Sequence, residues 1–333
     1  MLGRQPNTIM TTTTFARLAA LCLCLFCGLS HAADADTLTT AVPAADCPPV
    51  ATPTADMMRA AIASGGERGP LWRISKDGHA SFLYGTLHVG KALWYAPGPL
   101  MLEALKQTDL LALELDPLDP VVNAEMAVQL AAAPQVRLAP STQARLARAW
   151  QLECLPAAAL NGGPAEMKAV AVSMLAARRQ GLDPAYGSEI MLSAVARGSN
   201  WPVVSLETVA TQLGLILGKN SDEVEAMVRD MLDELDADPN HVKMIRLVDA
   251  WAGADMAELA AYEQWCDCIK SDADRARMKR MLGDRNPGLA QRIDELHASG
   301  RRVFAAVGAL HMTGATALPA LMAARGYEVQ RLR

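Results

Sequence analysis

The sequence lacks a strong excess of charge of either sign and is poor in aromatic residues. Its 333 residues include 31 Lys and Arg against 36 Asp and Glu, a net charge of −5, and only 5% Phe, Trp and Tyr. Nucleic-acid surfaces need basic stripes and stacking rings, so this composition argues against a nucleic-acid partner. With 51% hydrophobic and 20% charged residues, the chain can bury a core, which excludes disorder for most of its length.

Several catalytic signatures are also absent. The sequence has no His-Glu-x-x-His, which excludes a zincin, and no Gly-x-Ser-x-Gly, which weakens the case for a serine hydrolase. Glycine-rich phosphate-binding loops are missing too. The apolar run at 18–29 has about 12 residues, fewer than the roughly 20 that a membrane-spanning helix needs.

The N-terminal residues predict export. Basic residues precede the apolar run, and the small residues Ser30 and Ala32 follow it, as at the cleavage site of a secretory signal. We therefore expect a signal peptide at 1–32, no transmembrane segment after cleavage, and a periplasmic or secreted protein. Residues 33–67 begin with a stretch rich in Ala, Pro, Thr and Asp, and we expect a flexible leader there, with order starting near Leu71.

Four of the seven cysteines remain after this cleavage, namely Cys47, Cys154, Cys266 and Cys268. An even number in an exported chain predicts two disulfides, with three connectivities open. A sulfur-only metal site is disfavoured, because the Cys266 and Cys268 pair has no second closely spaced pair to complete it.

The pattern of apolar runs predicts an α/β fold. A strand, a Gly-x-x-His sequence, a helix and a second strand occur in that order at 81–115 and again at 302–332. We expect these two repeated units to form a central sheet that frames a mostly helical middle region, about 121–200, with further helices to about 299. In a parallel sheet the loops at the carboxyl ends of strands form ligand crevices.

Two histidines are the first candidates for chemistry. His88 in Gly85-Thr-Leu-His88 and His311 in Gly308-Ala-Leu-His311 take the same place in the two units. A single histidine there is usually a loop or capping residue, but the duplication makes coincidence less plausible. The glycine three residues earlier lets the backbone approach an ion or substrate closely. The histidines at 79, 241 and 297 look like surface or loop residues.

Acidic candidates lie at the ends of apolar strands. Glu114 follows Leu-Ala-Leu, where a buried charge is costly unless it is paired or bound to a metal; the alternative is an edge carboxylate facing water. Glu207 follows Pro-Val-Val-Ser-Leu, and its alternative role is to cap the next helix. Glu189 is either a site residue or a first-turn residue favoured by the helix dipole.

Arg285 precedes a helix for which Asn286 serves as the expected N-cap and Pro287 as the first helical residue. Arg285 itself could reach a carboxylate or carbonyl of a substrate. Two histidines with one or two carboxylates form a nitrogen and oxygen set that suits Zn, Mn, Fe or Co. Such an ion would polarise a carbonyl and acidify its bound water, which a further carboxylate could deprotonate.

Together these segments resemble the TraB/GumN family, which includes the Tiki proteases and is distantly similar to the erythromycin esterase and ChaN-like haem-binding proteins. The segments that carry the resemblance are Leu71-Trp-Arg-Ile, Gly85-Thr-Leu-His88, Leu113-Glu114-Leu-Asp116, Gly187-Ser-Glu189, Leu206-Glu207-Thr208, Arg285-Asn286, Gly308-Ala-Leu-His311 and Gly326-Tyr-Glu-Val. Each is weak alone, but the ordered set is specific. It assigns residues 68–333 to one domain of this family; Glu189 is a departure, since many relatives have Asp there.

The resemblance implies a metal-dependent hydrolase, peptidase-like, that uses a divalent ion such as Mn, Co or Zn and acts on a peptide or protein substrate. It assigns His88, Glu114 and His311 as metal ligands. It also assigns Glu207 or Glu189 to water activation and Arg285 to substrate orientation or oxyanion stabilisation. The alternatives are a non-catalytic haem- or metal-binding periplasmic protein and a scaffold that supports polysaccharide or conjugation machinery.

Overall fold

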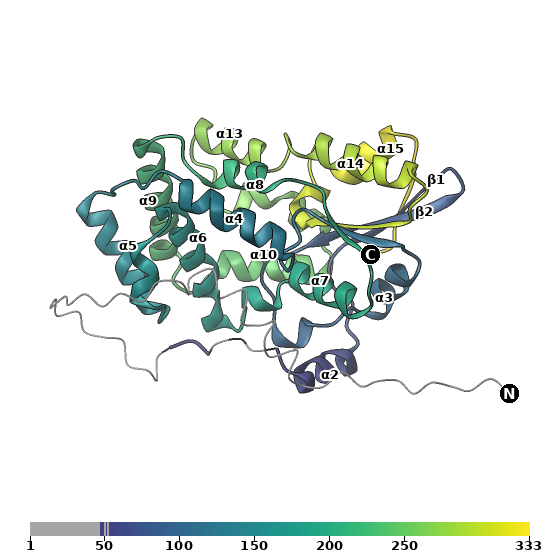
Figure 1. Ribbon diagram of the computed structural model, residues 1–333, viewed down its shortest axis with the longest axis horizontal. Helices are drawn as coiled ribbons and strands as arrows, with labels where there is room; N and C mark the ends of the chain where they lie inside the picture. Colours follow the sequence, from purple (N-terminus) through teal and green to yellow (C-terminus); the bar gives the residue numbers. More distant parts are fainter. Residues whose placement is uncertain (1–46, 50, 52) are drawn as a thin grey trace. The chain divides into compact units, whose positions relative to one another are not determined.

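A computed structural model describes residues 47–49, 51 and 53–333, and its core is a six-stranded mixed sheet in the order β4-β3-β5-β2-β1-β6 (Figure 1). The strands are β1 (Leu71–Lys76), β2 (His79–Thr86), β3 (Leu110–Leu113), β4 (Val203–Ser205), β5 (Val303–Gly308) and β6 (Glu328–Arg331). β1 is antiparallel to both of its neighbours, whereas β2, β3, β4 and β5 run parallel. The predicted α/β class is confirmed.

The two repeated units form β2–α3–β3 and β5–α15–β6, with α3 at Pro99–Lys106 and α15 at Leu318–Ala324. β2 and β5 are neighbours, but their connections run in opposite directions along the sheet, from β2 to β3 and from β5 to β6, and over opposite faces. In Figure 1, α15 accordingly lies on one side of the sheet and α3 on the other. Where the loops that follow two adjacent parallel strands turn toward opposite faces of the sheet, a crevice forms at the carboxyl ends of those strands.

Both faces of the central strands β3 and β5 are buried. Along β5, Phe304 and Ala306 pack against α3, α7 (Ser188–Gly198) and α10 (Val242–Gly253), whereas Val303 and Ala305 pack against α14 (Asn286–Ala298) and α15. A strand with apolar side chains on both faces is typical of a central parallel strand covered by helices.

The middle of the chain is helical, as predicted. The remaining elements are α4 (Pro120–Ala132), α5 (Pro140–Leu152), α6 (Ala165–Leu175), α8 (Val209–Ile216), α9 (Ser221–Ala237), α11 (Met256–Ala260), α12 (Tyr262–Trp265) and α13 (Asp272–Met281), with 3-10 turns η3 (Ala92–Trp94), η4 (Ala157–Asn161), η5 (Ala176–Gln180), η6 (Pro184–Tyr186) and η7 (Ala309–Met312). α5, α6 and α9 share a separate core around Trp150, Ala169 and Val228.

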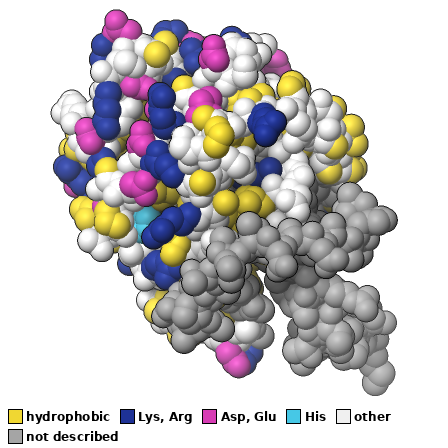
Figure 2. All heavy atoms as spheres, turned by 90° about the vertical axis from the view of Figure 1, so that its left-hand side faces the viewer, with side chains coloured by type: hydrophobic (Ala, Val, Ile, Leu, Met, Phe, Trp, Pro, Cys, Tyr) yellow, Lys and Arg dark blue, Asp and Glu magenta, His cyan; other side chains and the backbone are white. Residues whose placement is uncertain are grey.

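On the face that contains α5 and α9, basic and acidic side chains are interspersed (Figure 2). Arg145 of α5, for example, pairs with Asp233 at 2.8 Å and Asp236 at 2.6 Å, both on α9. The charges on this face therefore neutralise one another locally.

Ordered structure begins earlier than the sequence suggested. Helix α2 (Ala55–Ser64) lies within the stretch expected to be a flexible leader, and its Met57 and Met58 pack against the core of the sheet. The expected signal peptide at 1–32 lies outside the described residues. Within the described part of the chain, no helix is both long enough and apolar enough to span a bilayer.

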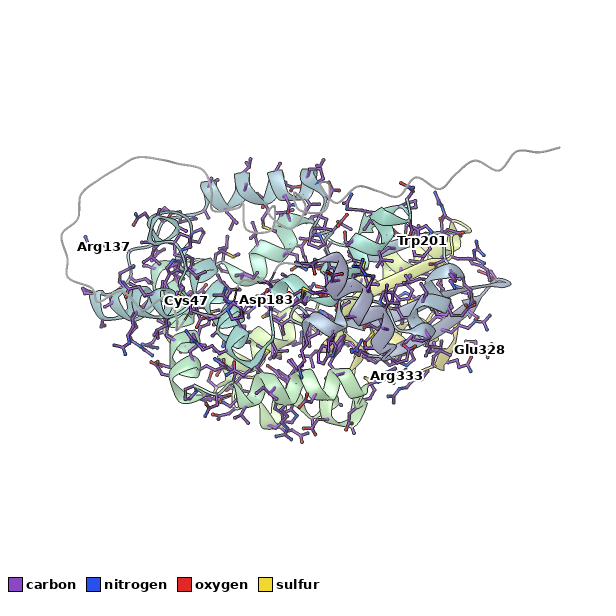
Figure 3. The ribbon with its side chains drawn as sticks, turned by 90° about the horizontal axis from the view of Figure 1, so that it is seen from below. Cys47, Arg137, Asp183, Trp201, Glu328 and Arg333 are labelled. Atoms are coloured by element: carbon purple, nitrogen blue, oxygen red, sulfur yellow. A yellow bond between two sulfur atoms is a disulfide. The ribbon has the colours of Figure 1, made fainter. Side chains whose placement is uncertain are left out.

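Both expected disulfides form, as Cys47–Cys154 and Cys266–Cys268. The first joins residues 107 positions apart and ties the N-terminal segment to the end of α5 (Figure 3). In the chain-entropy account, closing a loop of about 100 residues contributes about 4.7 kcal/mol, and far shorter loops contribute less.

His297 is fully buried, which corrects the expectation of a surface residue. Its Nδ1 lies 2.8 Å from Ser81 Oγ and its Nε2 lies 3.1 Å from the Lys76 carbonyl oxygen, while the His79 ring stacks on it at 3.8 Å. Burial lowers the pKa of His297, because a charged ring would lose its hydration there.

The free energy of unfolding should therefore fall as the pH is lowered from 7 to 5. His297 titrates near 6.5 in the unfolded chain but lower in the folded chain, so below pH 6.5 the unfolded state binds more protons. His297→Gln should be less stable at pH 7 yet show a flatter pH slope in urea denaturation at pH 7, 6 and 5. His241→Asn is the control, and equal slopes for wild type and His297→Gln would contradict the assignment.

Candidate functional site

The predicted residues come together at the carboxyl edge of the parallel strands. Glu114 directly follows β3, and Glu207 follows β4 by two positions. His88 lies two residues beyond β2, and His311 lies in η7 beyond β5. Because Thr86 of β2 pairs in register with Gly308 of β5, the two histidine loops start side by side.

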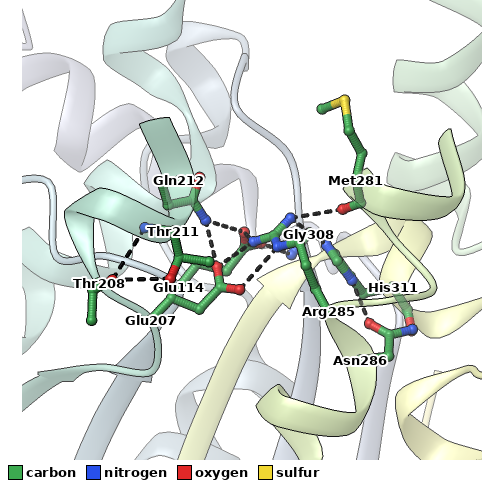
Figure 4. Close-up of polar contacts among 10 residues, drawn as sticks. All are labelled: Glu114, Glu207, Thr208, Thr211, Gln212, Met281, Arg285, Asn286, Gly308 and His311. Atoms are coloured by element: carbon green, nitrogen blue, oxygen red, sulfur yellow. Dashed lines mark hydrogen bonds and ion pairs between the residues drawn. The ribbon is translucent and has the colours of Figure 1, made fainter. Parts of the chain in front are cut away.

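Arg285 occupies the centre of this group, and all five of its N–H donors are engaged (Figure 4). Nε donates to Glu207 Oε1 at 2.9 Å, and Nη1 donates to the Met281 carbonyl at 2.9 Å and to His311 Nε2 at 3.0 Å. Nη2 donates to the carboxylates of Glu114 and Glu207. The guanidinium is therefore fully satisfied by the protein itself.

Burial and charge set the protonation states of this cluster. Burial by itself raises the pKa of Glu114. At the acidic pH where Glu114 titrates, His311 is protonated, and the charges of His311, Arg285 and His88 together with the Gly308 N–H outweigh burial and lower the pKa to about 2. Burial also lowers the pKa of His311, to about 4. For Arg285, burial is outweighed by its hydrogen bonds to Glu207 and Glu114, so its pKa lies above the ordinary value. At neutral pH, Glu114 and Arg285 are charged and His311 is neutral.

Asn286 fixes the orientation of His311. Its amide nitrogen donates to the carbonyls of His311 at 3.2 Å and Thr316 at 2.8 Å, so its Oδ1 faces His311 Nδ1. Since Arg285 can only donate, His311 Nε2 carries the lone pair and Nδ1 carries the hydrogen. The expectation that Asn286 caps the helix is wrong: α14 begins at Asn286 itself, and its buried side chain turns to the histidine.

Two further groups hold Glu114. The Gly308 N–H donates to its Oε1 at 2.7 Å, and a Cβ at position 308 would lie 3.3 Å from that oxygen, so glycine permits this close approach. Gln212 of α8 donates to Glu114 at 3.1 Å and to Glu207 at 2.6 Å. Thr208 caps α8, which corrects the alternative role considered for Glu207.

His88 and Glu189 form a second pair beside this cluster. His88 Nδ1 lies 3.0 Å from Glu189 Oε1, in the first turn of α7. The Glu189 charge raises the pKa of His88 above its ordinary value, although the His88 side chain is 69% exposed and water weakens the attraction. Glu189 therefore fixes one ring nitrogen and leaves Nε2 for another partner.

The Gly187-Ser188-Glu189 segment fits closely against the His88 loop. Ser188 N donates to the Leu87 carbonyl at 3.0 Å, and Leu87 N donates to Ser188 Oγ at 2.7 Å. A Cβ at Gly187 would lie 2.7 Å from the His88 carbonyl oxygen, so only glycine fits. These contacts explain why Glu189 follows a glycine and a serine.

Helix α7 is anchored at its far end by Asp116. Ser193 Oγ donates to this buried carboxylate at 2.6 Å, and Arg197 forms an ion pair with it. The carboxylate that follows β3 by three residues therefore holds the helix that carries Glu189.

The described residues contain no group of three or more His, Cys, Asp or Glu arranged around one metal position. Glu114 and His311 both face the guanidinium of Arg285, and His88 is paired with Glu189. A hollow of about 410 Å³ lined by Arg73, Asp77 and His79 lies at the opposite end of β2, away from these residues. The metal-ligand set His88, Glu114 and His311 stays a prediction.

Sequence reasoning missed Gln212, whose single amide in an apolar helix carries no signal of its own. It found the two histidines, the three glutamates and Arg285, which the fold places at one edge of the sheet.

Comparison with protein families gives a match between residues 70–331 and the model of the TraB/PrgY/gumN family. Comparison with curated proteins gave no match, and neither did comparison with solved structures.

Removing the guanidinium should destabilise the fold. Arg285→Met leaves two buried carboxylates without a counter-charge, and we expect a loss of about 3–5 kcal/mol at pH 7. The loss should shrink at pH 5, where the carboxylates can take up a proton. Arg302→Met, which breaks the half-exposed pair with Asp109, should cost much less, because water screens that pair. Equal losses in chemical denaturation would show that the Arg285 cluster contributes no more than a surface pair.

Proposed function

The chain belongs to the TraB/PrgY/gumN family, and we propose that it is a metal-dependent hydrolase of peptide-like carbonyl compounds whose reaction centre is formed by His88, Glu114 and His311. One observation carries the proposal. Both Gly-x-x-His histidines have Nδ1 held by a side-chain oxygen, of Glu189 and Asn286 respectively, so Nε2 is the ligating nitrogen that each ring can offer. In the present arrangement, Nε2 of His311 accepts a hydrogen bond from Arg285.

This arrangement is typical of metal-binding histidines. Such rings usually hydrogen-bond through their second nitrogen to a carboxylate or carbonyl, which fixes the tautomer and the direction of the ligating nitrogen. His311 is neutral and Glu114 is ionised, the states that metal ligation requires. The charge of Glu189 raises the pKa of His88 to about 9, so His88 must release a proton when it binds a metal. With that proton released, the donor set fits a divalent ion in its chemistry.

A divalent ion such as Mn, Co or Zn would be held by His88, Glu114 and His311 and would polarise a carbonyl and acidify a bound water. Two of these donors face Arg285 in the present arrangement, so its guanidinium must withdraw from them. Glu207 and Gln212 are placed to keep hold of Arg285 and Glu114. A role of Arg285 or Glu207 on the substrate needs the same rearrangement.

We further propose that the protein works in the periplasm or outside the cell, on a peptide or protein substrate. The two disulfides support this, because such bonds persist in oxidising compartments. Hydrolysis and peptide specificity both rest on the expectation drawn from the family, whereas the proposed metal binding is supported by the orientation of the two histidines.

Hydrolysis should depend on both histidines and on added metal. The purified chain is assayed against a peptide library and small carboxylic esters with Mn, Co or Zn, and after chelation. His88→Asn and His311→Asn should each lower the rate at least about 100-fold, whereas His241→Asn, outside the site, should stay within about twofold. Metal bound through these histidines without hydrolysis of any substrate would favour a binding protein, and haem absorbance would favour the haem-binding alternative.

Glu189 should act as a positioning residue through His88. Glu189→Gln should lower metal affinity about 10–100-fold, measured by titration calorimetry with Mn or Co, because the ring loses its charged partner. Glu103→Gln on the exposed face of α3 is the matched control. Unchanged affinity in Glu189→Gln would remove His88 from the ligand set.

A further inference from the structure

We propose that the Cys266–Cys268 disulfide is a thiol–disulfide exchange site, which opens to small thiols in the folded protein while Cys47–Cys154 stays closed. The site lies between α12 and α13 and shares no residue with the histidine cluster. The proposal is therefore independent of the hydrolase assignment.

The ring closed by this disulfide contains a single intervening residue, Asp267. A disulfide lowers the conformational entropy of the unfolded chain by an amount that grows with the logarithm of the number of residues in the loop it closes. The Cys266–Cys268 bond therefore lowers this entropy far less than Cys47–Cys154, which spans 107 positions. Folding therefore protects the Cys266–Cys268 disulfide from reduction less than it protects Cys47–Cys154.

The backbone at Asp267 also favours opening. Its φ is 55°, in the left-handed region that residues with a Cβ seldom adopt. Opening the ring frees Asp267 to return to ordinary backbone angles, so part of the conformational penalty is relieved by reduction.

The two sulfurs differ in access. Cys266 is 1% exposed, whereas Cys268 is half-buried, so an incoming thiol reaches Cys268 Sγ. The backbone N–H of Cys268 lies 3.1 Å from Cys266 Sγ and donates to it. This hydrogen bond stabilises negative charge on Cys266 as it leaves. Lys243 and Lys270 pair with Asp267 at 3.3 and 3.8 Å and add positive charge to the same loop.

The exchange balances as follows. The thiolate of a small thiol attacks Cys268 Sγ, the Sγ–Sγ bond breaks, and its electron pair leaves on Cys266, which takes a proton from water. A second small thiolate attacks the small-molecule sulfur of the mixed disulfide and releases Cys268 as a thiolate. Two small thiols are oxidised to their disulfide, and one protein disulfide is reduced.

The test uses the full chain in buffers of set reduced-to-oxidised glutathione ratio, with free thiols trapped by alkylation and located by mass spectrometry. We expect Cys266 and Cys268 to become labelled at ratios that leave Cys47 and Cys154 closed, with the circular dichroism unchanged. Opening of both disulfides together, or of Cys47–Cys154 first, would overturn the proposal.

A matched pair of variants isolates the role of the backbone. Asp267→Gly and Asp267→Ala both remove the carboxylate, but only glycine adopts the left-handed region without penalty. The equilibrium constant for closing Cys266–Cys268 in glutathione buffers should be about fivefold higher in the glycine variant than in the alanine variant. Equal constants would show that the conformation of Asp267 does not govern the exchange.

Discussion

The guanidinium of Arg285 is the interaction on which the rest of the site depends. It joins Glu114 after β3, Glu207 after β4 and His311 in η7 to the start of α14, four segments that lie far apart in the sequence. Two carboxylates at this depth are tolerated only because a positive charge lies between them. Burial keeps His311 neutral, and the hydrogen bond from Arg285 directs its Nε2 toward the guanidinium.

The sequence was most informative where a charge interrupts an apolar pattern. Glu114 and Glu207 could be selected because each ends a mostly apolar run of strand residues, and parallel strands bring such ends to one edge. His88 and His311 could be selected because the units that carry them repeat. The order of the strands in the sheet could not be predicted from the sequence in this way, because it depends on which face of the sheet each connecting helix covers.

Residues that act only through tertiary contacts were either not identified from the sequence or were assigned the wrong role. Gln212 lies in an apolar helix, and Asn286 precedes a proline, so local rules assign the first to no role and the second to a helix cap. The glycines of the two repeats were expected to leave room for a ligand. A Cβ at Gly85 would instead contact Pro70 and Ala309, and Gly308 makes room for the carboxylate of Glu114.

The strand order has a consequence for how the protein is made. β5, which lies between β2 and β3 in the sheet, comes from residues 303–308, and β6, which completes the far edge, follows it. While the ribosome synthesises the first 300 residues, β2 and β3 have no partner strand between them, and their apolar residues stay available to chaperones. The central sheet can close only after residues 303–308 have emerged from the ribosome, although the separate core of α5, α6 and α9 consists entirely of residues made before then.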